Sequence, residues 1–355
     1  MSLTIEQQNA VDILYSRIKS REKLTILAGI AGSGKTYTMR YLLNQLPHRN
    51  IVGCSFTGTA AKQLENSSGL NSVTLHNLLY TPIIVRDEVV GFEKKHPQAF
   101  ENIDLIVLDE HAMTPKKLME DLLELDIPII ALGDVNQLPA IGESHQYASM
   151  FHARLTEPMR QSLNNPILNL AYKALNGELV VNGVYGKDDS VLVANKTELN
   201  PKWLHREVQV ICGTNKTKDK INDFITGNAH FPATGDRIMF LKNSFKQSIT
   251  NGTMATVLNC YNRGKFLDMY FRNDGTGQKG RVKTLWRESN PKFNKFITTN
   301  CDFQFAATTH KLQGATIDRN CILIDESWAF REHSRNWLYT ALTRIAENRK
   351  LIWLR

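Results

Sequence analysis

The sequence predicts an α/β fold in which helices cover mainly parallel sheets. Short apolar segments alternate with helix-like segments from residue 24 onward, which is the β-α-β-α order of such sheets. Polar residues typical of binding sites directly follow several of the apolar segments. Because parallel strands end at one edge of a sheet, these polar residues are expected to lie together at that edge.

The composition is that of a globular protein with room for two or three domains. The chain has 355 residues, of which 42% are hydrophobic and 22% are charged. No apolar run approaches the roughly 20 residues of a membrane span, and residues 1–6 lack the features of a signal peptide. We expect a cytoplasmic protein, in the host cytoplasm if phage-encoded, with no membrane partner. The five cysteines form no C-x-x-C pair, so neither a zinc site nor a disulfide framework is indicated.

Residues 29–36 match the phosphate-binding loop G-x-x-x-x-G-K-[ST] at every fixed position. The apolar segment 24–28 before them predicts a strand, and residues 37–46 predict a helix, which is the context that this loop requires. Glycines let backbone N–H groups face an anion, Lys35 adds a positive charge for the β- and γ-phosphates, and Thr36 offers a hydroxyl to Mg²⁺. The expected nucleotide-binding residues here are Gly29, Ala31, Gly32, Ser33, Gly34, Lys35 and Thr36.

A second motif, an acidic pair after an apolar strand, also indicates a nucleotide-binding site. The nearly all-apolar segment 103–108 predicts a strand that ends in Asp109-Glu110, the Walker B arrangement. Asp109 would hold Mg²⁺ through water, and Glu110 would polarise the attacking water. A further strand at 127–132 precedes Gln137, whose amide could sense the γ-phosphate or could be satisfied within a turn. Arg160 is a candidate cation.

Other segments fill in the organisation. Thr4 and Gln7 form a capping-box pattern at the start of a helix, so Gln7 has a purely structural alternative. Residues 51–56 predict a strand, and residues 57–62 begin another helix. Residues 83–92 predict two short strands about an Asp87-Glu88 turn, an inserted β-hairpin followed by the polar segment 93–97.

A second α/β unit begins near residue 190 without a second phosphate-binding loop. It is interrupted at 241–300, where 11 Lys or Arg residues face 3 Asp or Glu residues, so the net charge of +8 is concentrated there. Asn251-Gly252 is a hairpin signal in this segment. Aromatic residues are interleaved with its cations: Phe245, Tyr261, Phe266, Tyr270, Phe271, Trp286, Phe293 and Phe296. They fit either a nucleic-acid contact surface or the core of a small β-domain.

Taken in order, the motifs resemble those of superfamily 1 helicases, above all the 1B branch of the RecD and phage Dda type. The resemblance covers nearly the whole chain. The matching segments are Leu3-Thr4 with Gln7, then 29–36, 57–62, 74–76, 109–113, 133–139, 155–160, 308–314 and 339–344. His111-Ala112 and Leu312 depart from the usual residues of their motifs, which weakens the transfer of DNA contacts there.

The resemblance implies two RecA-like lobes with ATP and Mg²⁺ between them. The implied ranges are 1–77 with 101–160 for the first lobe, 78–100 for its inserted pin hairpin, 161–240 with 301–355 for the second lobe, and 241–300 for a small basic SH3-like barrel. Gln7 would read adenine, Gly314 would contact the nucleotide, and Arg344 with Arg160 would clamp the transferred phosphoryl group. The implied DNA contacts are Thr57, Lys62, Thr74, His76, Phe92, Asn215, Asn251 and His310, with Phe92 stacking at the junction.

The leading hypothesis is an ATP-driven helicase moving 5′→3′ on single-stranded DNA, its direction taken from the resemblance. One alternative is a translocase that removes bound proteins or moves branched DNA without robust unwinding. Another is a binding module with ATP as a switch, against which Lys35, Glu110 and Arg344 argue. An RNA substrate also stays open. We expect a monomer that binds single-stranded DNA and strand junctions, with a single-strand-binding protein or replisome component as a further partner.

Overall fold

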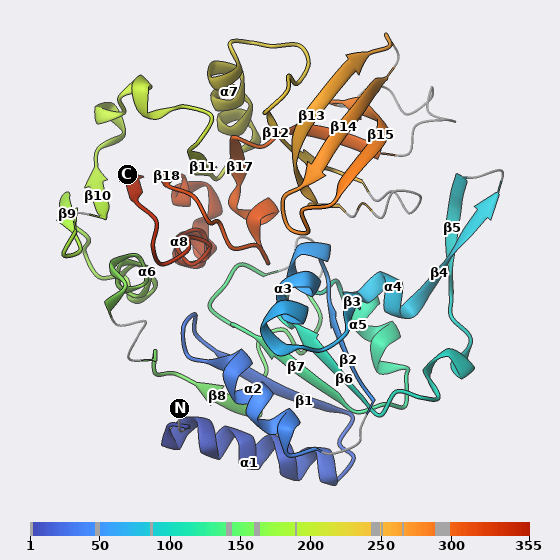
Figure 1. Ribbon diagram of the computed structural model, residues 1–355. Helices are drawn as coiled ribbons and strands as arrows, with labels where there is room; N and C mark the ends of the chain where they lie inside the picture. The colour runs from blue at the N-terminus through green and yellow to red at the C-terminus, as the bar shows by residue number, and fades with distance from the viewer. Residues whose placement is uncertain are drawn as a thin grey trace. The chain divides into compact units, whose positions relative to one another are not determined.

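The computed structural model describes residues 3–46, 50–85, 88–139, 144–159, 164–188, 190–242, 249, 251–264, 266–287 and 299–355 (Figure 1). The chain divides into two compact units, Met1–Asn164 and Asn165–Arg355. Within these ranges, no helix combines the length and apolar character needed to cross a membrane.

The first unit is an α/β layer structure. In its described part, six strands form one sheet in the order β3-β2-β6-β7-β1-β8, with parallel neighbours throughout. The strands are β1 (Leu24–Gly29), β2 (Ile51–Ser55), β3 (Ser72–Thr74), β6 (Leu105–Asp109), β7 (Ile129–Gly133) and β8 (Ala153–Leu155). The helices are α1 (Ile5–Lys19), α2 (Lys35–Asn44), α3 (Gly58–Ser68), α4 (Leu75–Leu79) and α5 (Lys116–Leu123).

Alternation along the strands explains why helices cover both faces of this sheet. Leu27 and Val107 face one side and join the buried residues of α1 and α2, such as Leu14. Ile26 and Ile106, their chain neighbours, face the other side and join α4 and α5. Side chains of a strand alternate between faces, so a strand that is apolar at every position needs cover on both.

The segment expected as an inserted hairpin contains an antiparallel pair, β4 (Tyr80–Val85) and β5 (Glu88–Lys94). Tyr80 pairs with Lys94, so β5 continues through residues 93–94, which the sequence analysis placed in the polar segment after the hairpin. Its length is fixed by the partner strand, not by its own apolar residues. Asp87 of the expected turn lies outside the described residues.

The second unit has a sheet of its own. Its described strands follow the order β17-β11-β18-β19-β10-β9, and β9 alone among them is antiparallel to its neighbour. The strands are β9 (Gly183–Tyr185), β10 (Val191–Ala194), β11 (Gln209–Cys212), β17 (Ala306–Thr308), β18 (Cys321–Ile324) and β19 (Leu351–Leu354). The helices are α6 (Pro166–Asn176), α7 (Asn215–Thr226) and α8 (Ser334–Leu342).

A closed barrel of five described strands is inserted between α7 and β17. Its strands are β12 (Arg237–Phe240), β13 (Met254–Asn262), β14 (Leu267–Asn273), β15 (Lys279–Trp286) and β16 (Thr299–Phe303). They extend past both ends of the basic segment 241–300, because β12 and β16 close the barrel through buried residues rather than through its cations. Phe240 and Phe271 meet edge to face inside it, with ring centroids 5.0 Å apart.

The aromatic residues of the basic segment divide between core and surface. Phe271 and Trp286 pack in the barrel core, whereas Tyr261 and Tyr270 are exposed. The core interpretation is therefore confirmed for Phe271 and Trp286, and nucleic-acid contact by Tyr261 and Tyr270 stays a prediction. Phe245, Phe293 and Phe296 lie outside the described residues.

Candidate functional site

The loop between β1 and α2 has the geometry of an anion-binding turn. Gly32 and Gly34 have φ angles of +72° and +82°, a region in which a side chain would cost about 1–2 kcal/mol. The Ser33 N–H donates to the Ile30 carbonyl at 3.2 Å, which closes the turn. Lys35 folds over the loop, and its Nζ donates to the carbonyls of Gly29 (2.7 Å) and Ile30 (3.1 Å). A phosphate oxygen would compete for these donor positions.

Gln7 takes part in the capping box of α1 and also contacts the phosphate-binding loop. Its Oε1 accepts from the Thr4 N–H at 3.1 Å, and its N–H donates to Thr4 Oγ1, so the predicted capping box is present. Its Nε2 donates to the Ser33 carbonyl in the loop at 3.1 Å. The side chain is 1% exposed. Gln7 therefore fixes the start of α1 against the phosphate-binding loop.

β8 and the segment after it form backbone hydrogen bonds with the phosphate-binding loop. The Met159 N–H donates to the Gly32 carbonyl at 2.9 Å, and the Ile30 N–H donates to the Leu155 carbonyl at 3.2 Å. Glu6 accepts from the backbone and hydroxyl of Thr156, both at 2.7 Å. The sequence interpretation missed Glu6, since an acid in a first helical turn is ordinary. Arg160 lies outside the described residues.

The strand register brings the two acids to the edge of the sheet where the loop lies. Ala28 of β1 pairs with Gly133 of β7, and Ser55 of β2 pairs with Asp109 of β6. β2, β6, β7 and β1 are adjacent and parallel in that order, so their carboxyl ends share one edge of the sheet. The loop is thereby brought together with Asp109 and the turn after Gly133, which lie more than 70 residues further along the chain.

Glu110 has a strained backbone. Its φ and ψ are +54° and +42°, a left-handed conformation that costs a residue with a side chain about 1–3 kcal/mol. The Glu110 N–H donates to Asp109 Oδ1 at 2.9 Å. Such strain persists where the surroundings enforce it, and it re-aims the side chain at the end of β6.

Gln137 and His111 lie beside this edge with unsatisfied polar atoms. Among the described residues, Gln137 Oε1 and both ring nitrogens of His111 have no hydrogen-bond partner, although both side chains are buried. A Cβ on Gly133 would lie 2.5 Å from the His111 ring, so only glycine fits at the end of β7. Burial, with a smaller effect of His145, lowers the pKa of His111 to about 4, and the ring is neutral at pH 7.

Several of the residues expected to contact DNA lie in the first unit. Phe92 and His76 are neighbours, with ring centroids 6.4 Å apart, and His76 also contacts Phe56 (6.2 Å) and Tyr80 (5.9 Å). Phe92 is 46% exposed. Burial lowers the pKa of His76, which favours a neutral ring. These rings form one aromatic cluster at the base of the β4–β5 pair.

Thr57 and Thr74, two of the expected DNA contacts, cap helices of the first unit. Thr57 Oγ1 accepts from the Ala60 N–H at 3.2 Å and caps α3. Thr74 Oγ1 accepts from the Asn77 N–H at 3.3 Å and caps α4. Thr74 pairs with Ser55, so both helix starts lie at the edge of the sheet that holds Asp109. Lys62, on α3, pairs with Glu65.

In the second unit, Gly314 and His310 follow β17, and Arg344 follows α8. Gly314 has a φ of +71°. The His310 ring lies 5.5 Å from Phe330, and burial lowers its pKa. Arg344 is 7% exposed, and its carbonyl accepts from the Ile317 N–H at 2.7 Å.

Asn215 begins α7, and the turn before it is held by Glu326, which the sequence interpretation missed. Glu326 accepts from the N–H groups of Gly213 (2.8 Å) and Thr214 (2.9 Å) and from the Thr217 hydroxyl (2.6 Å). Asn215 and Asn251 are both exposed, the latter before Gly252 at φ +86° and β13.

The model of the family described as an AAA domain matches residues 2–191, more than half of the chain. The chain belongs to this family. Its relatives assign it to the RecD/Dda/Pif1 type of superfamily 1B, which confirms the resemblance drawn from the motifs.

Two relatives illustrate the similarity. The chain is 27% identical over 382 residues to the ATP-dependent RecD2 DNA helicase of Deinococcus radiodurans, covering 97% of this chain and 48% of that protein. It is 28% identical over 249 residues to the ATP-dependent DNA helicase dda of Enterobacteria phage T4, covering 63% of this chain and 56% of that protein. The chain thus spans about half the length of these curated relatives.

Solved structures of Pif1 helicases share the fold. A structure of two Pif1 helicases at forked duplex DNA matches with a TM-score of 0.63 at 20% identity, covering 99% of this chain and 92% of that one. Bacteroides Pif1 bound to single-stranded DNA matches with a TM-score of 0.60 at 20% identity over the same shares. The α/β architecture with two parallel-sheet lobes is therefore that of this family.

Within this AAA-family chain, a buried acid fastens the β4–β5 pair to α5. Asp121, with a side chain 1% exposed, accepts from the Tyr80 hydroxyl and pairs with Lys94 (2.8 Å) and Lys117 (2.9 Å). Burial alone would raise the pKa of Asp121, but hydrogen bonds from Lys94, Tyr80 and Lys117 lower it to about 2. The pair of strands is therefore tied to the lobe at its base.

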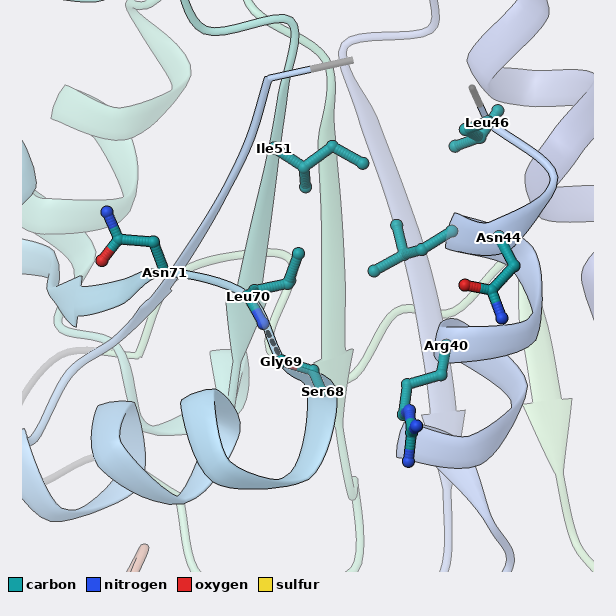
Figure 2. Close-up of a pocket in the computed structure, with 9 residues that line it drawn as sticks. Arg40, Asn44, Leu46, Ile51, Ser68, Gly69, Leu70 and Asn71 are labelled. Carbon is teal, nitrogen blue, oxygen red and sulfur yellow. Dashed lines mark hydrogen bonds between the residues drawn. The ribbon is translucent and has the colours of Figure 1, made fainter. Parts of the chain in front are cut away.

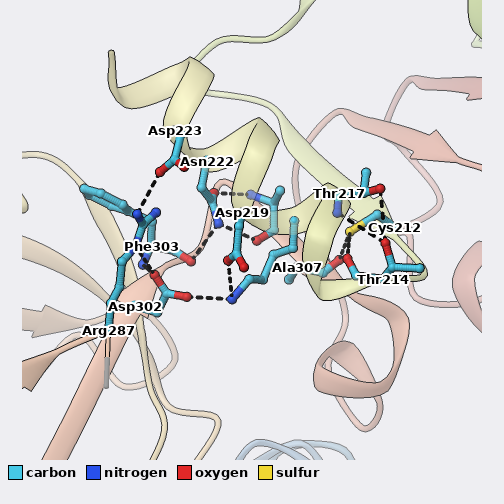
Figure 3. A network of polar contacts seen from close by, with 12 residues as sticks. Cys212, Thr214, Thr217, Asp219, Asn222, Asp223, Arg287, Asp302, Phe303 and Ala307 are labelled. Carbon is cyan, nitrogen blue, oxygen red and sulfur yellow. Dashed lines mark hydrogen bonds and ion pairs between the residues drawn. The ribbon is translucent and has the colours of Figure 1, made fainter. Parts of the chain in front are cut away.

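A comparable network joins the barrel to α7 (Figure 3). Asp302 of β16 accepts from Lys218 of α7 at 2.6 Å and from Arg287 at 2.9 Å, and Arg287 also pairs with Asp223 of α7 at 2.7 Å. Asn222 donates to the Phe303 and Ala306 carbonyls, each at 3.2 Å. Asn222 is fully buried, and the side chains of Lys218 and Asp302 are 10% and 8% exposed. Buried, satisfied polar contacts of this kind hold the barrel and α7 in one geometry.

A cavity of about 380 Å³ lies elsewhere in the first unit (Figure 2). It is lined from the end of α2, the start of β2 and the turn after α3, including Arg40, Ile51 and Asn71. The start of β2 is the opposite end of the strand from the phosphate-binding edge. The cavity is accordingly separate from the candidate nucleotide site.

The strain at Glu110 generates a prediction. Glu110→Ala and Glu110→Gly both remove the carboxylate, but only glycine relieves the left-handed conformation. In urea unfolding, the glycine variant should be more stable than the alanine variant by about 1 kcal/mol. An alanine variant of equal or greater stability would contradict the strained geometry.

The anchor at Asp121 generates another. Asp121→Asn should lower the free energy of unfolding of the first unit by about 1–3 kcal/mol at pH 7, because charged hydrogen bonds are lost in a buried position. Glu124→Gln is the matched control, since Glu124 also pairs with Lys94 but its side chain is 62% exposed; it should cost under about 1 kcal/mol.

The pH dependence of this anchor follows from the lowered pKa of Asp121. A depressed folded-state pKa gives stability that is complete above the ordinary value of 3.8 and is lost as the pH falls toward 2. The difference between wild type and Asp121→Asn should therefore shrink over that interval. A difference that persists at pH 2 would argue against the ionic anchor.

Proposed function

We propose that this chain is an ATP-dependent DNA helicase that moves 5′→3′ along single-stranded DNA and unwinds duplex DNA. The observation that carries the proposal is the convergence of the Lys35 loop and the Asp109-Glu110 pair at one sheet edge. A phosphate-binding loop beside a metal-binding and a water-orienting acid is the machinery of nucleotide hydrolysis. The direction is that of the superfamily 1B branch.

Each residue of the nucleotide site has a proposed role. Lys35 binds the β- and γ-phosphates, and the loop N–H groups of Ala31, Gly32, Ser33 and Gly34 line the phosphate path. Glu110 orients the attacking water, and Gln137, with its unpaired buried Oε1, senses the γ-phosphate. Gln7, already bound to the Ser33 carbonyl, links adenine recognition to the loop. Gly314 completes the nucleotide contacts.

Thr36 and Asp109 fit Mg²⁺, since a hydroxyl and a carboxylate are the hard oxygen ligands that this ion prefers. When bound, the ion would neutralise charge on the phosphates. Arg344 and Arg160 would supply the remaining positive charge for the transferred phosphoryl group. An arginine contributed by another lobe ties hydrolysis to closure of the two lobes, 1–77 with 101–160 and 161–240 with 301–355.

The nucleic-acid path is proposed to run over the helix starts capped by Thr57 and Thr74 and past His76 in the first lobe. Lys62, Asn215, Asn251 and His310 are proposed as further contacts. Residues 78–100 would act as the strand-splitting pin, with exposed Phe92 stacking on the junction base pair. The barrel is proposed to be SH3-like, and the protein is proposed to act as a monomer, with single-strand-binding or replisome proteins as candidate partners.

The test of this function is unwinding of two duplexes, one with a 5′ single-stranded tail and one with a 3′ tail. We expect ATP-dependent opening of only the 5′-tailed duplex, abolished by Lys35→Ala. Opening of only the 3′-tailed duplex would contradict the direction. If neither opens while single-stranded DNA still stimulates ATP hydrolysis, the protein is a translocase.

The pin assignment has its own test. Phe92→Ala should reduce the unwinding rate severalfold and leave DNA-stimulated ATP hydrolysis unchanged, because the ring contacts the junction and not the nucleotide. Thermal unfolding of the variant checks that the His76 cluster survives. Equal loss of unwinding and hydrolysis would rule out the pin role.

A further inference from the structure

The side of the barrel that faces away from its core has an ordered arrangement of polar and aromatic residues. Along β14, Leu267, Met269 and Phe271 are buried in the core, so the residues between them point outward. The outward residues of the three strands form what we term the outer face: Thr256, Asn259, Tyr261, Asp268, Tyr270, Arg272, Lys279, Arg281 and Lys283. Strands β13, β14 and β15 lie side by side in Figure 1.

Two tyrosine rings are exposed on this face. Tyr261 is 45% exposed and Tyr270 is 38% exposed, whereas Phe271, the next residue along β14, is 4% exposed. Tyr270 pairs with Asn259, and Tyr261 pairs with Asp268. The tyrosines are therefore diagonal neighbours on adjacent strands, with Cα atoms about 7–8 Å apart. That is the scale of one nucleotide step in an extended single strand.

The rings are held in place by their neighbours. Arg263 lies 5.4 Å from the centre of the Tyr261 ring, and Arg281 lies 5.1 Å from the centre of the Tyr270 ring. Asn259 Nδ2 donates to the Tyr261 hydroxyl at 2.9 Å. Each ring thus has a cation and a fixed orientation before any ligand arrives, which lowers the entropy that binding must overcome.

The charge of the face is positive. Asp268 is its acid, and both of its oxygens accept from Arg281, at 2.9 and 2.7 Å. The hydrogen bonds from Arg281 lower the pKa of Asp268, so this pair stays ionised and neutral overall. Arg272, Lys279 and Lys283 add positive charge to the described part of the face, and Arg263 lies beside it against Tyr261. Asp274, in the adjoining turn, accepts from the Thr256 hydroxyl.

We propose that the outer face is a binding surface for single-stranded nucleic acid, formed by residues other than the contacts proposed above. Bases stack on Tyr261 and Tyr270, and phosphates contact Arg272, Lys279 and Lys283. Stacking on aromatic rings together with a cationic track is how single strands are bound without regard to sequence. Duplex DNA hides the faces of its bases, and the carboxylates of an acidic peptide would pair with the cations but not with the rings.

This surface requires neither nucleotide nor hydrolysis, so it is testable even if the proposed motor function fails. The probe is a fluorescein-labelled oligothymidine carrying 5-iodouracil, and the full chain is used without ATP. Photocross-links should map by mass spectrometry to peptides containing Tyr261 or Tyr270. Cross-links confined to the two lobes would overturn the proposal.

Affinity measurements on matched variants complete the test. Tyr261→Ala/Tyr270→Ala should weaken oligothymidine binding by about tenfold or more, since stacking contributes strongly for each base. Tyr261→Phe/Tyr270→Phe should retain it, because the rings remain. Phe231→Ala, at a ring 42% exposed outside this face, is the control and should bind as wild type. Circular dichroism melts establish that every variant is folded.

The cations have a distinct signature. Lys283→Ala should weaken binding and reduce the slope of log affinity against log salt by about one phosphate contact. If the alanine double variant binds within twofold of wild type, the proposal is wrong. It is equally wrong if poly-glutamate competes with the oligonucleotide for this face while duplex and single strands bind alike.

Discussion

The parallel register of the first sheet is the constraint on which the rest depends. β7 is inserted between β1 and β6, although it follows both in the chain, and the pairing of Ala28 with Gly133 fixes how far each strand extends. A slip of one residue would turn every side chain of a strand to the other face. Strands that are apolar at every position are held against such a slip because both faces are buried.

Buried acids hold separate elements together in both units. Asp121 holds the β4–β5 pair, Asp302 joins the barrel to α7, and Glu326 fixes the turn before α7. In each case the acid accepts from donors on a different element. Buried ionic groups are costly unless every lone pair is satisfied, so these contacts specify one geometry more than they add stability. Rigid attachment suits the proposed motor, in which closure of the lobes would move the other parts.

The sequence predicted what local pattern and spacing determine. The phosphate-binding loop, the Walker B strand and both α/β units follow from apolar runs bounded by glycines and acids, and the structure contains them. The predicted capping box of Thr4 and Gln7 is confirmed, and the role of Gln7 in reading adenine stays a prediction.

Other features depend on contacts between distant residues and left no local signal. Glu326 lies more than 100 residues from the turn that it holds. The three-residue strand β9 exists only because β10 offers it an edge. The barrel extends to Arg237 and Phe303 because closure needs β12 to pair with β16, whereas composition marked only the cations. The left-handed Glu110 is likewise imposed by its surroundings.

The most direct test of the central claim is steady-state ATP hydrolysis with and without single-stranded DNA, measured on wild type and Lys35→Ala. The account predicts hydrolysis that rises at least tenfold with the strand and is absent in the variant. Hydrolysis that does not respond to the strand, or that survives loss of Lys35, would contradict a motor built at this edge of the sheet.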